Sequence, residues 1–294
     1  MSDLFAGTAR YYARYRPGYP DAVFDRLRAA FDLNGTGRLL DPGCGTGELA
    51  RPLHADFEEV IGVDISPEMI AEARRQSERQ GITNVEWLKL SAEDVRENLG
   101  RFRLATLGNS FHWMRQDEVL DKLYVLLESG GGVAVLGNPG GIWSDEDAWE
   151  RTAHEVIIRW LGPRRRTRTG TFTAEEGAEK VAIARSRFAN MTAGEYRWER
   201  SVDIDTILGE LYSTSFSNRV LLGKRADAFE ADLRGSLLAL ASSGPFVTCA
   251  PSTSWHTSAD AEVSRRSKRV KPCVECCHLD PAFWPGGCRC HPRW

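Results

Sequence analysis

The chain has 294 residues and a formal net charge of −3. This length can bury one large core, or a core with a smaller cap, and the slightly negative charge argues against bulk binding of nucleic acid. No apolar run approaches the roughly 20 residues that a membrane span needs, and the first residues lack the basic and apolar regions of a secretory signal. We therefore expect a cytoplasmic protein without a membrane partner.

The first 36 residues are predicted to form a helical lid. Residues 8–32 have a helical pattern that Pro17 and Pro20 interrupt, because a proline inside a helix removes a hydrogen bond and clashes with the preceding turn. Two short helices are therefore expected in place of one.

Residues 37–141 alternate between strand and helix patterns. Five short apolar runs are predicted as strands, at residues 38–41, 59–64, 85–90, 104–108 and 133–136. Helices are predicted between them, from Thr46 to about His54, from Ser66 to Gly81, and over 116–128. This alternation is typical of an α/β fold with a doubly wound, mostly parallel sheet.

The alternation stops after residue 141. Residues 142–194 are expected to form an inserted cap, mainly helical, with a basic loop at 164–168 that is either a solvated surface or an anion contact. Residues 195–247 are expected to complete the core, with a strand near 194–202 and helices near 203–212 and 225–241.

Residues 248–294 are expected to be an irregular tail, because they show no periodicity. Six of the seven cysteines follow residue 248. The spacings Cys273-x-x-Cys276 and Cys288-x-Cys290 leave zinc binding open, but the second pair is too closely spaced for a typical zinc site. We assign no metal.

The run Asp-Pro-Gly-Cys-Gly-Thr-Gly-Glu at residues 41–48 is the most informative motif. Gly43, Gly45 and Gly47 allow a sharp turn after the first strand and a close approach of the backbone to a ligand. Asp64 ends the second strand, where a carboxylate can accept both hydroxyl groups of a ribose. The pattern predicts a ligand that carries an adenosine-like ribose.

The acidic residues around this loop indicate which kind of ribose-containing ligand it binds. Glu48 stands where the dinucleotide-binding fingerprint has its last glycine, and Asp41 precedes the first glycine by two residues. Both carboxylates would repel a pyrophosphate and suit a ligand with a positive ammonium. The run D-x-G-C-G-T-G resembles the first motif of class I S-adenosylmethionine-dependent methyltransferases, and Asp64 resembles their ribose-binding acid.

The resemblance implies S-adenosyl-L-methionine as cofactor and a Rossmann-like core. It also implies that the segment after the third strand frames the adenine, which makes Ser91, Ala92 and Glu93 candidate contacts. Further cofactor candidates are Ile65 and Met69 beside Asp64, Asn109 after the fourth strand, and Tyr15 and Arg16 in the lid. The lid residues have an alternative role in packing an amphipathic helix.

The pair His112-Trp113 follows the fourth strand, on the side where the methyl group lies in this fold. His112 is a candidate general base, although methyl transfer depends mainly on alignment, and both residues have an alternative role in core packing. Candidate substrate contacts are Tyr19, Trp113 and Trp143.

The segment Arg16-Pro17-Gly18-Tyr19-Pro20 together with His112-Trp113 resembles the trans-aconitate methyltransferase-like branch of this family. The resemblance implies methyl transfer to an oxygen, nitrogen or carbon atom of a small metabolite, with no nucleic-acid partner. Two alternatives stay open: a nucleic-acid methyltransferase, although the amino-methylating motif is absent from residues 109–112, and a protein that binds the cofactor without turnover.

Overall fold

The computed structural model describes residues 4–137, 147–164, 166–167, 170–171, 177–188, 190–240 and 245–258. Trp143, the cysteine-rich segment after residue 258 and some residues of the expected basic loop lie outside these ranges. Among the described residues, no helix is long and apolar enough to cross a membrane, and no group of three His, Cys, Asp or Glu side chains could hold a metal ion.

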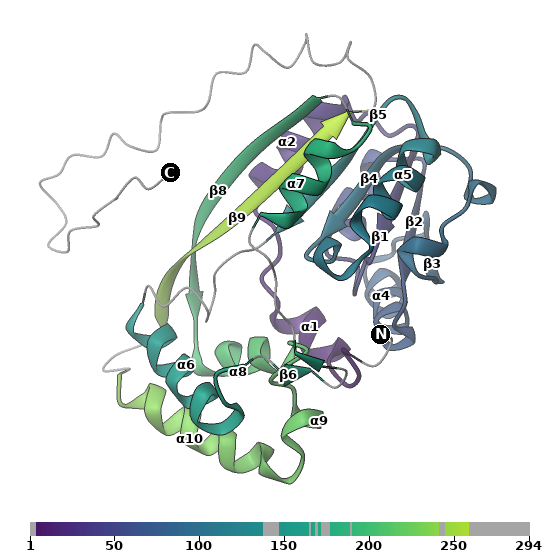
Figure 1. Ribbon diagram of the computed structural model, residues 1–294. Helices are drawn as coiled ribbons and strands as arrows, with labels where there is room; N and C mark the ends of the chain where they lie inside the picture. Colours follow the sequence, from purple (N-terminus) through teal and green to yellow (C-terminus); the bar gives the residue numbers. More distant parts are fainter. Residues whose placement is uncertain are drawn as a thin grey trace, which may run out of the picture.

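A seven-stranded sheet in the order β3-β2-β1-β4-β5-β9-β8 forms the centre of the molecule (Figure 1). Strands β1 to β5 are parallel, and β9 is antiparallel to both of its neighbours, β5 and β8. The strands are β1 (Arg38–Pro42), β2 (Glu59–Asp64), β3 (Val85–Lys89), β4 (Phe102–Gly108), β5 (Leu127–Gly137), β8 (Asn190–Val202) and β9 (Phe246–Ser258). The mostly parallel sheet predicted from the sequence is confirmed.

Helices cover both faces of this sheet because successive strand residues point to opposite sides. Leu39 packs with α2 (Asp21–Phe31), α3 (Ala50–Leu53) and α4 (Pro67–Gln80), whereas its neighbour Leu40 packs with α5 (Gln116–Leu126) and α7 (Ala178–Arg185). Strands buried on both faces explain the continuous apolar runs in the sequence.

The helix boundaries follow local signals. Helix α1 (Ala9–Tyr15) ends before Pro17, and α2 begins after Pro20, as expected. Helix α4 begins at Ser66, whose Oγ accepts from the Met69 N–H at 3.4 Å, and it ends at Gly81 with φ +68°. Short 3-10 turns complete the connections: η1 (His54–Asp56), η2 (Ala92–Asp94), η3 (Glu97–Leu99), η4 (Phe111–Trp113) and η5 (Gly223–Arg225).

A second group of helices forms the cap. It contains α6 (Ala148–Leu161), α8 (Ile204–Tyr212), α9 (Arg219–Leu222) and α10 (Ala226–Leu238), which share an apolar core of their own. A short hairpin of β6 (Arg166–Thr167) and β7 (Gly170–Thr171) belongs to the same half of the chain.

This arrangement corrects the expected domain boundaries. Residues 195–247 do not all belong to the core, because α8 to α10 pack against α6 in the cap. Residues 142–194 do not all belong to the cap either, because α7 packs on α5 and the sheet. The boundaries were wrong because packing partners, and not order along the chain, decide where an amphipathic helix lies.

The expectation of an irregular tail from residue 248 is wrong for residues 248–258. These residues belong to β9, which pairs with β8 from Val202↔Phe246 to Asn190↔Ser258 and with β5 from Gly137↔Thr253 to Gly132↔Ser258. Pro251 lies opposite Arg197, outside the stretch that pairs with β5. Here β9 pairs with β8, and among the described residues no strand lies at its other edge, so a residue without an N–H is tolerated.

Candidate cofactor site

A pocket lies at the carboxyl ends of β1 to β4, where the strand order reverses between β1 and β4. In doubly wound sheets ligands bind at this reversal. The pocket measures about 820 Å³, including space open to solvent. Its wall contains Leu4, Phe5, Tyr12, Gly43, Gly45, Asp64, Ile65, Ser66, Met69, Leu90, Ser91, Ala92, Glu93, Gly108, Asn109, Ser110, Trp113 and Met114.

The glycine loop forms the floor of this pocket. Gly43 (φ +69°) and Gly45 (φ +55°) line it, and a Cβ on Gly43 would lie 2.6 Å from the Ser110 Cβ. Gly47 (φ +89°) does not line it; a Cβ there would lie 2.6 Å from Trp87 Cη2. The first two glycines therefore leave room at the ligand, and the third allows packing of the loop on the sheet.

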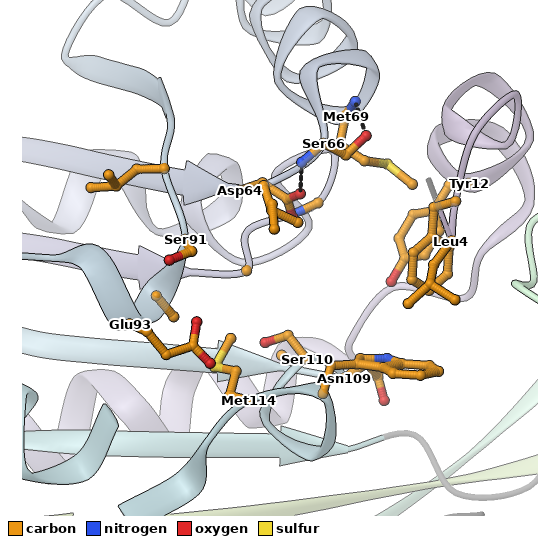
Figure 2. Close-up of a pocket in the computed structure, with 18 residues that line it drawn as sticks. Leu4, Tyr12, Asp64, Ser66, Met69, Ser91, Glu93, Asn109, Ser110 and Met114 are labelled. Carbon is orange, nitrogen blue, oxygen red and sulfur yellow. Dashed lines mark hydrogen bonds between the residues drawn. The ribbon is translucent and has the colours of Figure 1, made fainter. Parts of the chain in front are cut away.

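Asp64 is held rigidly at the end of β2. Its Oδ1 accepts from the Ser66 N–H at 2.8 Å and its Oδ2 from the Gly45 N–H at 3.0 Å (Figure 2). Burial raises the pKa of this carboxyl group, and the two N–H donors oppose the rise. Each carboxylate oxygen keeps a lone pair after these bonds, so the group can still accept from two neighbouring hydroxyl groups.

The part of the pocket wall beside Asp64, which we call the slot, contains apolar side chains. Ile65, 40% exposed, and the buried Met69 provide apolar contacts on one side, and Ala92 lies in the segment after β3. The Ser91 hydroxyl donates to Asp94 at 2.8 Å. The Glu93 carboxylate accepts from the Arg115 N–H at 3.0 Å and lies in the pocket wall (Figure 2).

The loop after β4 closes the other side. Asn109 adopts φ +50°, which is uncommon for a residue other than glycine, and its Nδ2 donates to the Tyr19 hydroxyl at 3.0 Å. Strained backbone of this kind often lies at ligand sites. Trp113 lines the pocket and meets Phe5 edge to face, with ring centroids 6.0 Å apart.

A smaller pocket of about 420 Å³ adjoins the first and shares Tyr12, Gly43, Gly108 and Asn109 with it. Its other lining residues are Arg16, Pro17, Tyr19, Asp41, Cys44, Glu48 and Leu49. The two pockets are therefore adjacent, and these four shared residues form their junction.

Two buried polar atoms in the smaller pocket have no hydrogen-bond partner among the described residues: Arg16 Nε and Asp41 Oδ2. The other Asp41 oxygen accepts from the Thr106 hydroxyl at 2.7 Å. Burial raises the pKa of Asp41 to about 7, with Glu48 and Asp64 adding to the rise. Because unpaired buried polar groups are costly, this pocket is suited to a ligand carrying both an anion and a cation.

Most of the predicted cofactor residues come together here, but several candidates do not. Tyr15 packs on α8, where a Cβ on Gly209 would fall within its ring. Gly47 supports Trp87, as described above. His112 is not among the residues that line either pocket; its Nδ1 lies 3.3 Å from Glu179 Oε1 on α7. Trp143 lies outside the described residues.

Tyr12 is the functional candidate that the sequence analysis missed. It lines both pockets, and the Arg16 guanidinium lies 5.1 Å from its ring centroid. The helical spacing could have predicted it: residues four apart lie on one face of a helix, so Tyr12 lies on the same face as Arg16, which was already a candidate. Tyr11 and Tyr15 occupy the other face, stacked with centroids 6.3 Å apart.

Several known proteins resemble this chain in sequence. Residues 39–131 match the family described as methyltransferase domain. An uncharacterized methyltransferase of Schizosaccharomyces pombe is 29% identical over 51% of this chain and 57% of its own length. An uncharacterized RNA methyltransferase of Listeria innocua is 34% identical over 30% of this chain and 19% of its own length. The chain thus spans about half the length of the first relative and less of the second.

Solved structures share the fold. A candidate type II methyltransferase from Anaeromyxobacter dehalogenans aligns with a TM-score of 0.57 and 20% identity, covering 83% of this chain and 97% of that one. A candidate methyltransferase from Bacillus halodurans aligns with a TM-score of 0.50 and 14% identity, covering 81% of this chain and 99% of that one.

Proposed function

We propose that this chain transfers the methyl group of S-adenosylmethionine to a small organic acceptor, since residues 39–131 match the family described as methyltransferase domain and the fold resembles that of a candidate methyltransferase. The observation that supports this proposal most strongly is the pair of unpartnered buried atoms, Arg16 Nε and Asp41 Oδ2, in a pocket that adjoins the Asp64 pocket. The two adjoining pockets thereby offer the Asp64 carboxylate as a hydrogen-bond acceptor for a ribose, and Arg16 and Asp41 as charged partners for an amino acid.

The residues present fit this cofactor. Asp64 would accept the ribose hydroxyls, and the slot between Met69 and Ala92 would hold the adenine. Arg16 would pair with the methionine carboxylate, and Asp41 with the ammonium. Each unpaired atom would then gain a charge-assisted hydrogen bond, which is about twice as strong as a neutral one.

A dinucleotide fits less well. Its pyrophosphate would lie at the glycine loop, where Asp41 and Glu48 line the smaller pocket. Two carboxylates would repel the phosphates, and Arg16 is the only cationic side chain among the described residues that line either pocket.

When bound, the cofactor would supply an electrophilic methyl group on a positively charged sulfur, and that sulfur would be the leaving group. The chain aligns this step and excludes water from it. Tyr12, Gly108 and Asn109 lie at the junction of the two pockets, and Trp113 and Phe5 line the larger one. Trp113 and Tyr19 are proposed acceptor contacts. A role for His112 as a base stays a prediction, because its imidazole faces Glu179.

Calorimetric titration of the full chain with S-adenosylhomocysteine and, separately, with NAD tests the cofactor. Binding of the first with little binding of the second is expected; the reverse order would refute the proposal. Transfer of a labelled methyl group to a metabolite extract, and not to RNA, is then expected. Transfer to RNA would favour the acceptor class named for the Listeria relative. Binding without transfer to either would indicate a non-catalytic protein.

A further inference from the structure

A third cavity, which we call the β8 groove, lies on the far side of the linker between α1 and α2. It is open and measures about 590 Å³. Its lining comes from the linker, from β8 and from the start of α8: Tyr15, Pro17, Gly18, Tyr19, Trp198, Arg200, Ser201 and Thr206. None of the proposed cofactor contacts lines it, so the cofactor leaves it free.

The β8 groove and the smaller cofactor pocket share a wall. Pro17 and Tyr19 line both cavities. The Tyr19 hydroxyl is bonded to Asn109 Nδ2, and it lies 2.9 Å from the place that a Cβ on Gly108 would take. Gly108 and Asn109 also line both cofactor pockets. A molecule in the groove is therefore separated by the Tyr19 side chain from the junction of the two cofactor pockets.

The chemistry of the groove is aromatic and close to neutral. Tyr15, Tyr19 and Trp198 provide ring surfaces, which favour flat ring systems. Arg200 is the only charged side chain among the described lining residues, and it is ion-paired with Glu210, which is 7% exposed. Because this carboxylate balances the guanidinium, the groove offers little net attraction to an anion.

Hydroxyl groups add polarity without charge. Ser201 and Thr206 line the groove beside Arg200, and each hydroxyl can donate and accept a hydrogen bond. Such partners recognise neutral polar substituents on an otherwise apolar ligand.

We propose that the β8 groove holds the ring of the methyl acceptor, and that this acceptor is a neutral aromatic molecule whose phenolic hydroxyl passes the Tyr19 side chain to reach the cofactor site. The inference rests on the proposed function. In the transfer, a lone pair of the phenol oxygen forms the new O–CH₃ bond. The S–CH₃ bond breaks with its electrons returning to sulfur, which leaves a neutral thioether, and the phenol proton passes to solvent.

The test uses two probes that share a naphthalene ring, the neutral 2-naphthol and the anionic 2-naphthoate, and follows their fluorescence during titration of the full chain saturated with S-adenosylhomocysteine. We expect 2-naphthol to bind more tightly. Trp198→Leu should weaken its binding at least tenfold, whereas Trp198→Phe should change it less than threefold, because it keeps a ring. Glu199→Gln is the matched control on the same strand, since its exposed side chain points to the opposite face.

Each contrary result overturns a defined element of the proposal. Tighter binding of 2-naphthoate overturns the neutral class. Binding of 2-naphthol that Trp198→Leu leaves unchanged overturns the location, and absence of binding overturns both. S-adenosylhomocysteine is titrated first and alone; failure at that stage refutes the proposed function, and failure only with the naphthyl probes refutes the groove.

Discussion

Binding of S-adenosylhomocysteine is expected to strengthen as the pH rises from 6 to 8. Asp41 is 1% exposed, one of its oxygens is unpaired, and burial raises its pKa to about 7. The ligand's ammonium, charged throughout this range, needs the ionised carboxylate. Below the pKa, the fraction of ionised Asp41 falls tenfold for each pH unit. Affinity at pH 6 should therefore be about tenfold lower than at pH 8, or about 1.4 kcal/mol.

The same group affects folding with a defined sign. Between pH 3.8 and about 7 the folded protein keeps a proton on Asp41 that the unfolded chain has lost. This contribution to stability is complete below pH 3.8 and is lost as the pH rises through about 7. The rise in pKa corresponds to a loss of up to about 4 kcal/mol across that window.

The matched variant is Asp41→Asn, which keeps an oxygen to accept from Thr106. Calorimetry at pH 6, 7 and 8 should show weak binding by this variant with a smaller dependence on pH than that of the wild-type chain. Glu48, whose pKa burial also raises, titrates in the same direction, so the difference between the two proteins isolates Asp41. Equal affinity of the wild-type chain at pH 6 and pH 8 would refute the reasoning.

Other consequences can be measured separately. Asp64→Ala should weaken binding of S-adenosylhomocysteine by about 1.5–3 kcal/mol, seen by calorimetry, because it removes a charged hydrogen-bond acceptor; unchanged affinity would remove Asp64 from the site. His112→Ala should lower kcat less than tenfold, since the imidazole faces Glu179; a loss of roughly 10² or more with unchanged cofactor affinity would support a general base. Gly47→Ala should destabilise the fold by about 2–4 kcal/mol in thermal unfolding through its clash with Trp87, whereas Gly81→Ala, also at positive φ but with nothing within 4 Å, should cost about 1–2 kcal/mol; equal losses would contradict the clash. A chain ended at Pro251 should aggregate, because it loses every pair between β5 and β9; a chain ended at Ser258 is the control, and a soluble, stable Pro251 product would contradict this role of β9.

Local signals made the first half of the fold predictable. The break at Pro17 and Pro20 and the caps at Ser66 and Gly81 each fix the backbone within a few residues. Strand β9 lacks such a signal, because its pairing comes from β5 and β8, which flank it. Its sequence Thr-Cys-Ala-Pro-Ser-Thr-Ser-Trp over 248–255 does not alternate and contains a proline. The extended conformation of β9 therefore depends on pairing with β5 and β8, which are distant in sequence.

The candidate site likewise contains residues that a local motif predicted and residues whose place depends on tertiary packing. Gly43, Gly45 and Asp64 were predicted because a short motif places them at strand ends. The choice between Tyr12 and Tyr15 depends on how α1 is rotated against α8, and neighbouring sequence does not specify that rotation. The β8 groove could not be predicted, because it joins residues 15–19 to residues 198–206 through the docking of the cap.

The position of β9 has a consequence during protein synthesis. This strand is made after both of its neighbours, and it inserts between β5 and β8. Until residue 258 leaves the ribosome, β5 has an open edge beside the finished parallel strands, and β8 has no partner in the sheet. An open edge can pair with another chain. On a polysome, many nascent chains with this open edge lie close together. Chaperones that keep these edges apart would therefore matter most for this protein during synthesis.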